Sequence, residues 1–427
     1  MVRSANGYSD REVNHNKDSR PPSKHDVLVH WLDRNIAHAE HPDHAHQDFH
    51  PVIQEFQRFI EGDPVIYMGF HQMFEQLPNR PPYDRDPTGR SQIGDYKLML
   101  KLFNRIVVTA PPYEDHLYVG FPINAIFNWP MGTPAGLAMF TNPRVNQMLS
   151  KIFDVWSAFL TSPDSRYVLT TEDDGWFGPR ASEKMPNFAE TYACDPSKDY
   201  YGFTSWDDFF TRVFRPGVRP VAFPDDHSII TNACESEPYR IAKNVKASDK
   251  FWLKGSPYSL EHMLNGDPFV SEFAGGTVYQ AFLSATSYHR WHSPVSGTVV
   301  RVAIVPGSYY ASSPAWVLPN DPDPVAQMQS QGFITCVACR AIVYIQADNP
   351  SIGLMCFMAV GMAEVSTCEV TVKDGDRLKK GDQLGMFHFG GSTHCLIFRP
   401  ETKVTFLKDY PPDSIVPLNA AIATVNM

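Results

Sequence analysis

The chain has 427 residues, of which 43% are hydrophobic and 20% charged, and its formal net charge is −10 at pH 7. A chain of this length can bury large cores and has room for two or three domains. Because the charge balance is acidic and no basic stripe is present, we expect neither nucleic acid nor an anionic lipid surface as a partner.

No segment has the composition of a membrane span or a secretory signal. The longest uncharged apolar run, residues 352–363, is too short to cross a bilayer, and residues 1–18 are polar. The seven cysteines are an odd number scattered along the chain, as is typical of reduced thiols. We therefore expect a cytoplasmic protein without stable membrane association.

The first residues of the chain carry little structural signal. Residues 1–28 contain almost no large apolar side chains, which predicts a disordered tail. Five histidines then follow in a short stretch: His38, His41, His44, His46 and His50. Their spacing is irregular, Pro42 interrupts it and no cysteine joins them, so a solvated loop is favoured over a metal site.

Residues 29–195 are predicted to form an α-helical N-terminal domain. Apolar residues recur at helical spacing in three segments: 52–60, 98–106 and 145–160. We expect the last of these helices to begin with Asn142 as its N-cap and Pro143 at its first position. The proline-rich stretches at 79–87 and 121–134 are predicted to be loops.

From residue 196 to 427 short β-rich segments alternate with Gly, Pro and Asp, which predicts a mainly β domain. The expected strands are 298–305, 333–345, 352–365, 368–372 and 384–389. Cys336 and Cys339 form a CxxC within the second of these segments. Because no second pair accompanies it, buried structural thiols are favoured over a zinc or redox site.

Two segments of this domain, 293–302 and 372–387, are similar to the halves of the biotinyl and lipoyl carrier sandwich. They predict a flattened barrel-sandwich-like core, and the fold class is therefore α+β, with a helical domain followed by a mainly β domain. They also raise a rival function, that of a swinging-arm carrier. A carrier needs an exposed lysine at a hairpin tip, and no such hairpin lies between the two segments, which disfavours this alternative.

The tetrapeptide Gly390-Gly391-Ser392-Thr393 is the strongest candidate for chemistry. A hydroxyl preceded by glycines can attack the carbonyl group before it, because glycine has no Cβ to block the approach. Taken alone, such a tetrapeptide is also typical of a plain turn. Two further segments favour the chemical interpretation: residues 287–297, with His289 and His292, and the residues around Glu235.

Tyr288–Pro294 and Gly390–Thr393, in this order and spacing, resemble motifs of the phosphatidylserine decarboxylase family of pyruvoyl enzymes. Other matching segments are Trp206–Arg212, Arg215–Pro220, Lys254–Leu260, Val305–Gly307 and Val360–Met362. The resemblance implies that the chain cuts itself between Gly391 and Ser392 and that Ser392 becomes a covalent pyruvoyl group, with no pyridoxal phosphate and no metal. We expect the two products, 1–391 and 392–427, to stay associated.

The resemblance also implies roles for the site residues. His292 matches the histidine that deprotonates Ser392, and a carboxylate behind it would fix its tautomer, as in a Ser-His-Asp triad. Glu235 stands where the family usually has the Asp of a Pro-x-Asp-Gly turn, with Glu237 as the alternative. His289 matches the histidine that protonates the substrate carbon once the pyruvoyl ketone has formed a Schiff base with the substrate amine and CO₂ has left.

The substrate is indicated less directly. No membrane segment is evident in the helical domain, which favours a free amino acid over a lipid. Residues 51–65 and 164–166 further resemble a fungal L-tryptophan decarboxylase branch of the family. The expected reaction converts L-tryptophan to tryptamine and CO₂. The alternatives are a phosphatidylserine decarboxylase that makes phosphatidylethanolamine and a non-catalytic relative, and the sequence does not indicate the oligomeric state.

Overall fold

The computed structural model of the chain describes residues 23–41, 48–78, 93–114, 121–284, 286–315, 329–364, 366–407 and 414–426. Residues 1–22 of the predicted tail and the predicted loop at 79–87 lie outside these ranges, whereas residues 23–28 belong to helix α1 (Ser23–Glu40). Of the five histidines, His38 lies in the last turn of α1 and the side chain of His50 caps the next helix, so the predicted solvated loop is wrong at these two positions.

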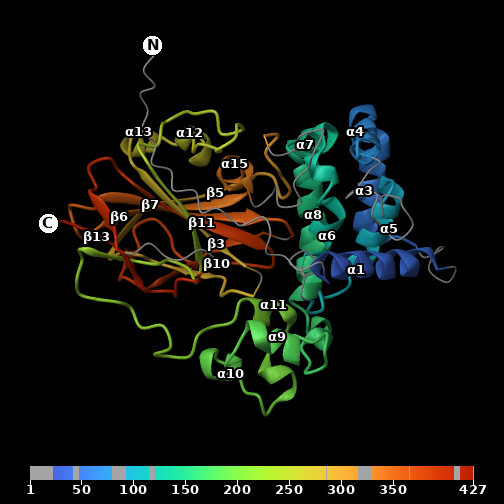
Figure 1. Cartoon of the computed structure of the whole chain (residues 1–427), viewed down its shortest axis with the longest axis horizontal. Coiled ribbons are helices and arrows are strands. Elements are labelled where there is room, and N and C mark those ends of the chain that lie inside the picture. The colour runs from blue at the N-terminus through green and yellow to red at the C-terminus, as the bar shows by residue number, and fades with distance from the viewer. Residues whose placement is uncertain are drawn as a thin grey trace.

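Helices form the N-terminal part, which lies at the right and at the bottom of Figure 1. The α-helices are α3 (Pro51–Gly62), α4 (Pro64–Glu75), α5 (Tyr96–Ile106), α6 (Pro122–Phe127), α7 (Pro134–Phe140), α8 (Pro143–Leu160), α9 (Pro179–Lys184), α10 (Phe188–Thr191) and α11 (Trp206–Phe210). Three 3-10 helices lie among them: η1 (Pro130–Gly132), η2 (Pro163–Val168) and η3 (Asp199–Gly202). The helices thus continue beyond residue 195, and the exact division into domains stays a prediction.

Prolines and polar caps explain where these helices begin. The Asn142 side chain accepts a hydrogen bond from a main-chain N–H of α8 at 2.9 Å, and Pro143 occupies the first turn, which confirms the predicted start. The predicted loop at 121–134 is wrong, because it contains three helix starts, each with a proline in the first turn: Pro122, Pro130 and Pro134. Proline suits this position, since the N–H that it lacks would have no partner within the helix.

The C-terminal part is built on an antiparallel seven-stranded sheet, at the left of Figure 1. Its strands, in spatial order, are β2 (Glu237–Lys243), β3 (Thr277–Leu283), β11 (Gly391–Phe398), β7 (Leu354–Met362), β6 (Arg340–Ala347), β5 (Gly297–Val305) and β9 (Arg377–Leu378). A first small sheet contains β4 (Arg290–His292), β10 (Gln383–Phe387) and β8 (Cys368–Val370). A second contains β1 (Ile229–Thr231), β13 (Ala421–Val425) and β12 (Val404–Phe406).

Both faces of the large sheet are covered. Side chains of β7 alternate between two apolar clusters, with Phe357 in one and Met358 in the other. The first cluster lies between the large sheet and the small sheets and includes Trp291 of β4. The second lies under the short helices α12 (Leu260–Met263), α13 (Val270–Phe273) and α15 (Gln331–Val337), at the upper side of the sheet in Figure 1. The central strands β11 and β7 are therefore packed on both faces, which fixes the positions of the residues that they contain.

The α+β class is confirmed, with two corrections of detail. The described strands do not close into a barrel, and the two expected halves lie edge to edge instead, with Gly297 of β5 opposite Leu378 of β9. The segment 333–345 is not one strand, because residues up to Val337 belong to α15 and β6 begins only at Arg340. A continuous apolar run does not distinguish a buried strand from a short buried helix.

Candidate active site

Ser392 lies in the middle of the large sheet. It is the second residue of β11, opposite Leu283 of β3 and Gly361 of β7. Its side chain is fully buried, and its hydroxyl has no hydrogen-bond partner among the described residues. Because side chains alternate along a strand, Ser392 shares a face with Leu396, which belongs to the cluster covered by β4. β4, the strand that covers this cluster, also carries His292.

The residue two positions before Ser392 must be a glycine. Gly390 has φ +153°, and a Cβ on it would lie 2.4 Å from the carbonyl oxygen of Glu364. That carbonyl lies just after β7, where Ala363 has φ +61° and Ser366, beyond it, has φ +40°. The N–H of Ser366 donates to the carbonyl of Phe389 at 3.0 Å, and this hydrogen bond joins the segment after β7 to the predicted cleavage loop.

The environment of His292 favours a neutral imidazole. Burial lowers its pKa, and its Nδ1 lies 2.7 Å from the carbonyl oxygen of Gly381, which accepts a proton but cannot donate one. Nδ1 therefore carries the hydrogen, and the other nitrogen, Nε2, accepts from the hydroxyl of Tyr288 at 3.1 Å. In this tautomer the lone pair of Nε2, the atom that a general base uses, is occupied by the Tyr288 hydroxyl.

His289 has a different environment, although it is only three residues away. It is fully buried and its ring stacks on Phe210 of α11, with the ring centroids 4.0 Å apart. Burial, assisted by the Arg212 guanidinium, lowers its pKa well below the usual value, and neither ring nitrogen makes a hydrogen bond of normal geometry among the described residues. The Phe387 N–H donates to its carbonyl at 2.9 Å, which places His289 beside the strand leading to the cleavage loop.

Glu235 is near His292 in the fold but is not bonded to it. The main-chain N–H of His292 donates to the carbonyl of Ala233 at 2.8 Å, so the two segments are neighbours. The Glu235 carboxylate, however, forms an ion pair with Arg219 at 2.5 Å and accepts from the Leu418 N–H at 2.6 Å. The expected orienting role is taken in this structure by the Gly381 carbonyl, and a role for Glu235 in cleavage stays a prediction. Glu237 starts β2, opposite Phe282.

Sequence reasoning missed His388, four residues before Ser392. Its Nδ1 lies 3.1 Å from both carboxylate oxygens of Asp207, and its Nε2 lies 2.8 Å from Glu369. Burial lowers its pKa, but the two carboxylates outweigh that effect and raise the pKa to about 9. His388 is thus a cation that ties the cleavage loop to α11 and β8. The sequence signal that could have identified His388 was its position directly before Phe389 and the Gly-Gly-Ser motif.

Glu364 was missed as well. It is fully buried, and its Oε1 accepts a hydrogen bond from the Asn124 N–H at 2.7 Å. Burial raises its pKa to about 8, against the opposing effect of nearby main-chain N–H groups. Its second oxygen, Oε2, has no partner among the described residues. A charged residue directly after a long apolar strand was the available signal.

Aromatic rings of the helical part surround Phe389, the residue before the glycine pair. Ring centroids lie 4.4 Å away for Trp206, 5.3 Å for Trp156 and 5.6 Å for both Phe121 and Phe210. Phe210 also contacts His289, so one ring bridges the loop and the histidine. The helical part therefore forms one wall of the candidate site.

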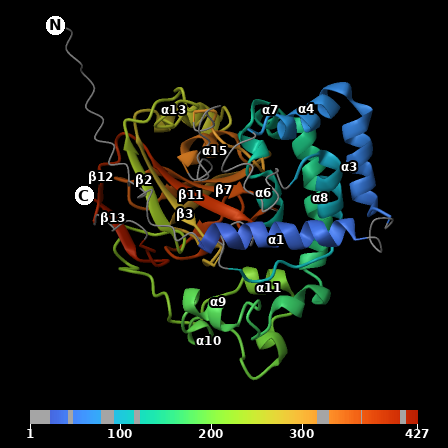
Figure 2. The same ribbon diagram turned by 45° about the vertical axis from the view of Figure 1, so that its right-hand side comes forward.

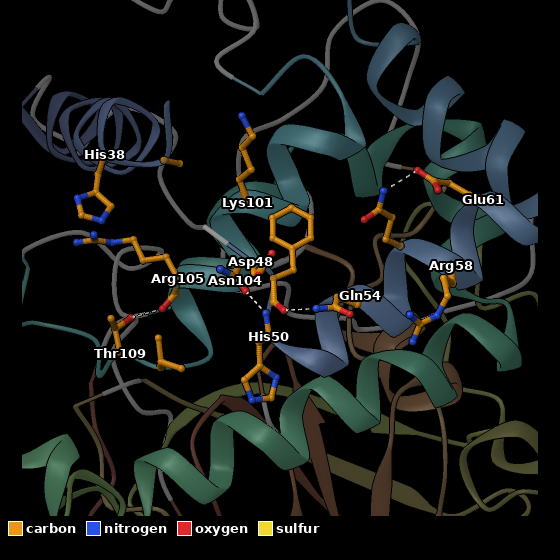
Figure 3. Close-up of a pocket in the computed structure, with 14 residues that line it drawn as sticks. His38, Asp48, His50, Gln54, Arg58, Glu61, Lys101, Asn104, Arg105 and Thr109 are labelled. Carbon is orange, nitrogen blue, oxygen red and sulfur yellow. Dashed lines mark hydrogen bonds between the residues drawn. The ribbon is translucent and has the colours of Figure 1, made fainter. Parts of the chain in front are cut away.

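The cavity drawn in Figure 3 is not this site. Its volume is about 1010 Å³, and it is lined by residues of α1, α3 and α5 and their connections, including His38, Arg58 and Asn104. None of the predicted site residues lines it. Within the described ranges, no group of three or more His, Cys, Asp or Glu side chains could hold a metal ion. Nor does that part of the chain contain a helix with the length and apolarity that crossing a membrane requires.

Comparison with known proteins agrees with these motifs. Two family models of phosphatidylserine decarboxylase match the chain, one over residues 50–185 and the other over residues 206–410. The chain is 47% identical to decarboxylase iboD of Amanita muscaria over 348 residues, which are 76% of this chain and 99% of that protein. It is 40% identical to the L-tryptophan decarboxylase of Psilocybe cubensis over 392 residues, 87% of this chain and 86% of that protein. Phosphatidylserine decarboxylase proenzyme 3 of Schizosaccharomyces pombe is 31% identical over 47% of the chain and 19% of its own length.

Proposed function

The chain is a decarboxylase of the phosphatidylserine decarboxylase family, and we propose that it processes itself and then decarboxylates a free aromatic amino acid, L-tryptophan first among them. The observation that carries this proposal is the similarity to L-tryptophan decarboxylases along nearly the whole length of both chains. By contrast, the similarity to the yeast lipid enzyme covers less than half of the chain. Decarboxylation of phosphatidylserine is the alternative function.

The first step of the proposal is cleavage between Gly391 and Ser392. His292 Nε2 takes the proton of the Ser392 hydroxyl, and the oxygen attacks the Gly391 carbonyl, which moves the acyl group from nitrogen to oxygen. The resulting ester loses the α-proton of Ser392 and releases the Gly391 carboxylate, which leaves a dehydroalanine. Its imine tautomer takes up water, releases ammonia and becomes the pyruvoyl end of residues 392–427.

The surroundings of Ser392 fit this conversion. The hydroxyl is buried and has no hydrogen-bond partner among the described residues, so His292 Nε2 has to exchange the Tyr288 hydroxyl for that of Ser392 before it takes the proton. The glycines before it leave its approach to the carbonyl open. Once formed, the pyruvoyl group supplies an electron-withdrawing carbonyl for the electron pair released when CO₂ departs. Burial in the sheet and beneath the aromatic wall excludes water from the reacting carbon.

His289 is proposed to move the proton that completes the reaction. Because its pKa is lowered, it is neutral at pH 7 and must first gain a proton before it can donate one. A substrate ammonium group has to lose a proton before its nitrogen can act as a nucleophile. We propose that a His289 ring nitrogen accepts that proton and later returns it to the carbon that lost CO₂.

Two measurements test the proposed function. Purified protein should give a small fragment with a mass that fits residues 392–427 and a blocked, pyruvoyl N-terminus, and Ser392→Ala protein should stay as one 48.2 kDa chain without activity. Without added pyridoxal phosphate, the processed protein should release CO₂ from L-tryptophan. Activity confined to phosphatidylserine vesicles would transfer the assignment to the lipid enzyme, and an active Ser392→Ala variant would refute the cleavage mechanism.

A further inference from the structure

Three buried polar atoms without partners gather behind the cleavage loop. They are Glu364 Oε2, the Tyr310 hydroxyl and Asn124 Oδ1, from side chains that are 0%, 0% and 2% exposed, and none has a hydrogen-bond partner among the described residues. A buried polar atom without a partner costs free energy, and in native proteins such an atom usually bonds a ligand or water. Three of them in one place indicate a site for a molecule with a polar group.

Contacts place these three residues near one another and near the predicted cleavage loop. The Asn124 N–H donates to Glu364 Oε1 at 2.7 Å, and the pKa of Tyr310 is raised first by burial and then by the nearby Glu364 carboxyl. The main-chain N–H of Ala363 donates to the carbonyl of Tyr309 at 2.8 Å, which joins the two segments. The carbonyl of Glu364 is the group that leaves no room for a Cβ on Gly390.

The surroundings of this polar cluster are aromatic. The ring of Tyr310 contacts Phe127, Phe140 and Phe153 at centroid distances of 5.1, 5.8 and 6.2 Å. A flat apolar ring with one polar edge matches such surroundings better than an aliphatic chain does.

We propose that Glu364 is a specificity-determining residue, whose Oε2 accepts a hydrogen bond from the ring N–H of an aromatic amino-acid substrate, with Tyr310 at the same polar end of the site. This inference rests on the proposed function and narrows its substrate class to amino acids with an N–H on the ring, such as tryptophan. Burial keeps much of the carboxyl neutral at pH 7, since its pKa is raised to about 8, and Oε2 keeps an acceptor lone pair in either protonation state.

The decisive variant is Glu364→Gln. The single amide oxygen of glutamine would take the place of Oε1, where it accepts the Asn124 N–H, and the NH₂ group would then face the substrate. The glutamine NH₂ group, a donor, would then face the ring N–H of the substrate, which is also a donor. The probe is 3-benzothienyl-L-alanine, which replaces the ring N–H of tryptophan with sulfur at nearly the same shape. The readout is kcat/KM for L-tryptophan divided by kcat/KM for this analogue.

We expect the wild-type protein to prefer L-tryptophan by about tenfold or more, the effect of one buried hydrogen bond. Glu364→Gln and Tyr310→Phe should reduce this ratio through a loss on L-tryptophan, with the analogue little changed. Tyr309→Phe, at the adjacent half-buried tyrosine, is the matched control and should keep the ratio. Self-cleavage, followed by the mass of the small fragment, shows that each variant has folded.

Each other outcome contradicts the proposal in a recognisable way. Equal losses on both substrates in Glu364→Gln would mean that Glu364 acts in the reaction or supports the fold, and an unchanged ratio would mean that it does not contact the ring. If Glu364→Gln is not processed, the ratio in Tyr310→Phe decides instead. Processed wild-type protein that acts on neither amino acid would refute the proposed function itself, and this inference with it.

Discussion

Three histidines within one site differ in charge because their neighbours differ. His388 lies between two carboxylates and is protonated at neutral pH, whereas His289 stacks on an apolar ring and is neutral. His292 is also neutral, and the Gly381 carbonyl fixes the position of its hydrogen. At the scale of single residues, the fold thus provides one cation and two neutral imidazoles from one residue type.

The two neutral histidines should separate the two reactions. His292→Ala is expected to leave the chain uncut, because no other base is assigned to the Ser392 hydroxyl. His289→Ala should cut normally but decarboxylate about 10²–10⁴-fold more slowly, the usual effect of losing a proton-transfer group. Denaturing gels measure the first effect and CO₂ release the second. His71→Ala, at a half-buried histidine of α4, is the control, and the opposite pattern would show that the two roles are exchanged.

His388 should make stability depend on alkaline pH. Its folded pKa of about 9 is above the ordinary value of 6.5, so its contribution is complete below pH 6.5 and is lost as the pH rises through about 9. The melting temperature of Ser392→Ala protein should therefore fall between pH 7 and pH 9.5 more steeply than that of the same protein with His388→Gln. Parallel curves would show that His388 is not charged in the folded state.

At the scale of elements, the position of the first residues of β11 depends on the contact between the segment after β7 and the loop before β11. Glu364 and Ser366 make main-chain contacts with the loop at 388–391, and Gly390 leaves room for the Glu364 carbonyl to approach that loop closely. Because Ser392 follows directly, its position relative to the preceding carbonyl is set by this packing. Small backbone shifts here should therefore act on cleavage before they act on the rest of the fold.

Gly390→Ala tests this dependence. Its Cβ would clash with a carbonyl oxygen at 2.4 Å, so we expect cleavage to slow by at least about tenfold, with a loss of about 1–3 kcal/mol in the free energy of unfolding. Gly375→Ala is the matched control, because Gly375 also has a positive φ, +89°, but nothing lies within 4 Å of its added Cβ. Similar cleavage rates in the two variants would contradict the role of the close contact.

At the scale of the whole molecule, the helical part acts as a wall of the site rather than as a separate module. Figure 2 shows α6 and α11 next to the sheet that carries β11. Phe389 inserts its ring among aromatic side chains from α8, α11 and the start of α6. The two parts therefore share a core beside the predicted cleavage site.

Phe389→Ala should reveal this coupling. Removing a fully buried ring costs about 3–5 kcal/mol, and here the cavity would also loosen the cleavage loop. Phe70→Ala, in the helical core away from the site, removes an equally buried ring and is the control for stability alone. Below the melting temperatures of both variants, only Phe389→Ala should cleave slowly. Equal cleavage rates would show that the wall has no influence on processing.

The sequence alone determined the elements whose signals are local. The cap and proline before α8, the apolar runs of β5 and β7, and the motifs around His292 and Ser392 each lie within a short window, where hydrogen bonding and side-chain periodicity decide the structure. Where two local signals compete, the prediction failed. Prolines at 122–134 start helices rather than loops, and the apolar run at 333–345 divides into a helix and a strand.

Only the tertiary structure decided which side chains meet. His388 and Asp207 are 181 positions apart, and the Asn124–Glu364 contact spans 240, so no local pattern encodes either pair. The same holds for Glu235, whose carboxylate binds Arg219 and Leu418 instead of His292. Charge states and tautomers follow from burial and from these distant partners. The candidate reacting residues are therefore predicted from the chain alone, but their protonation and the contacts that hold them depend on how the sheets and helices pack.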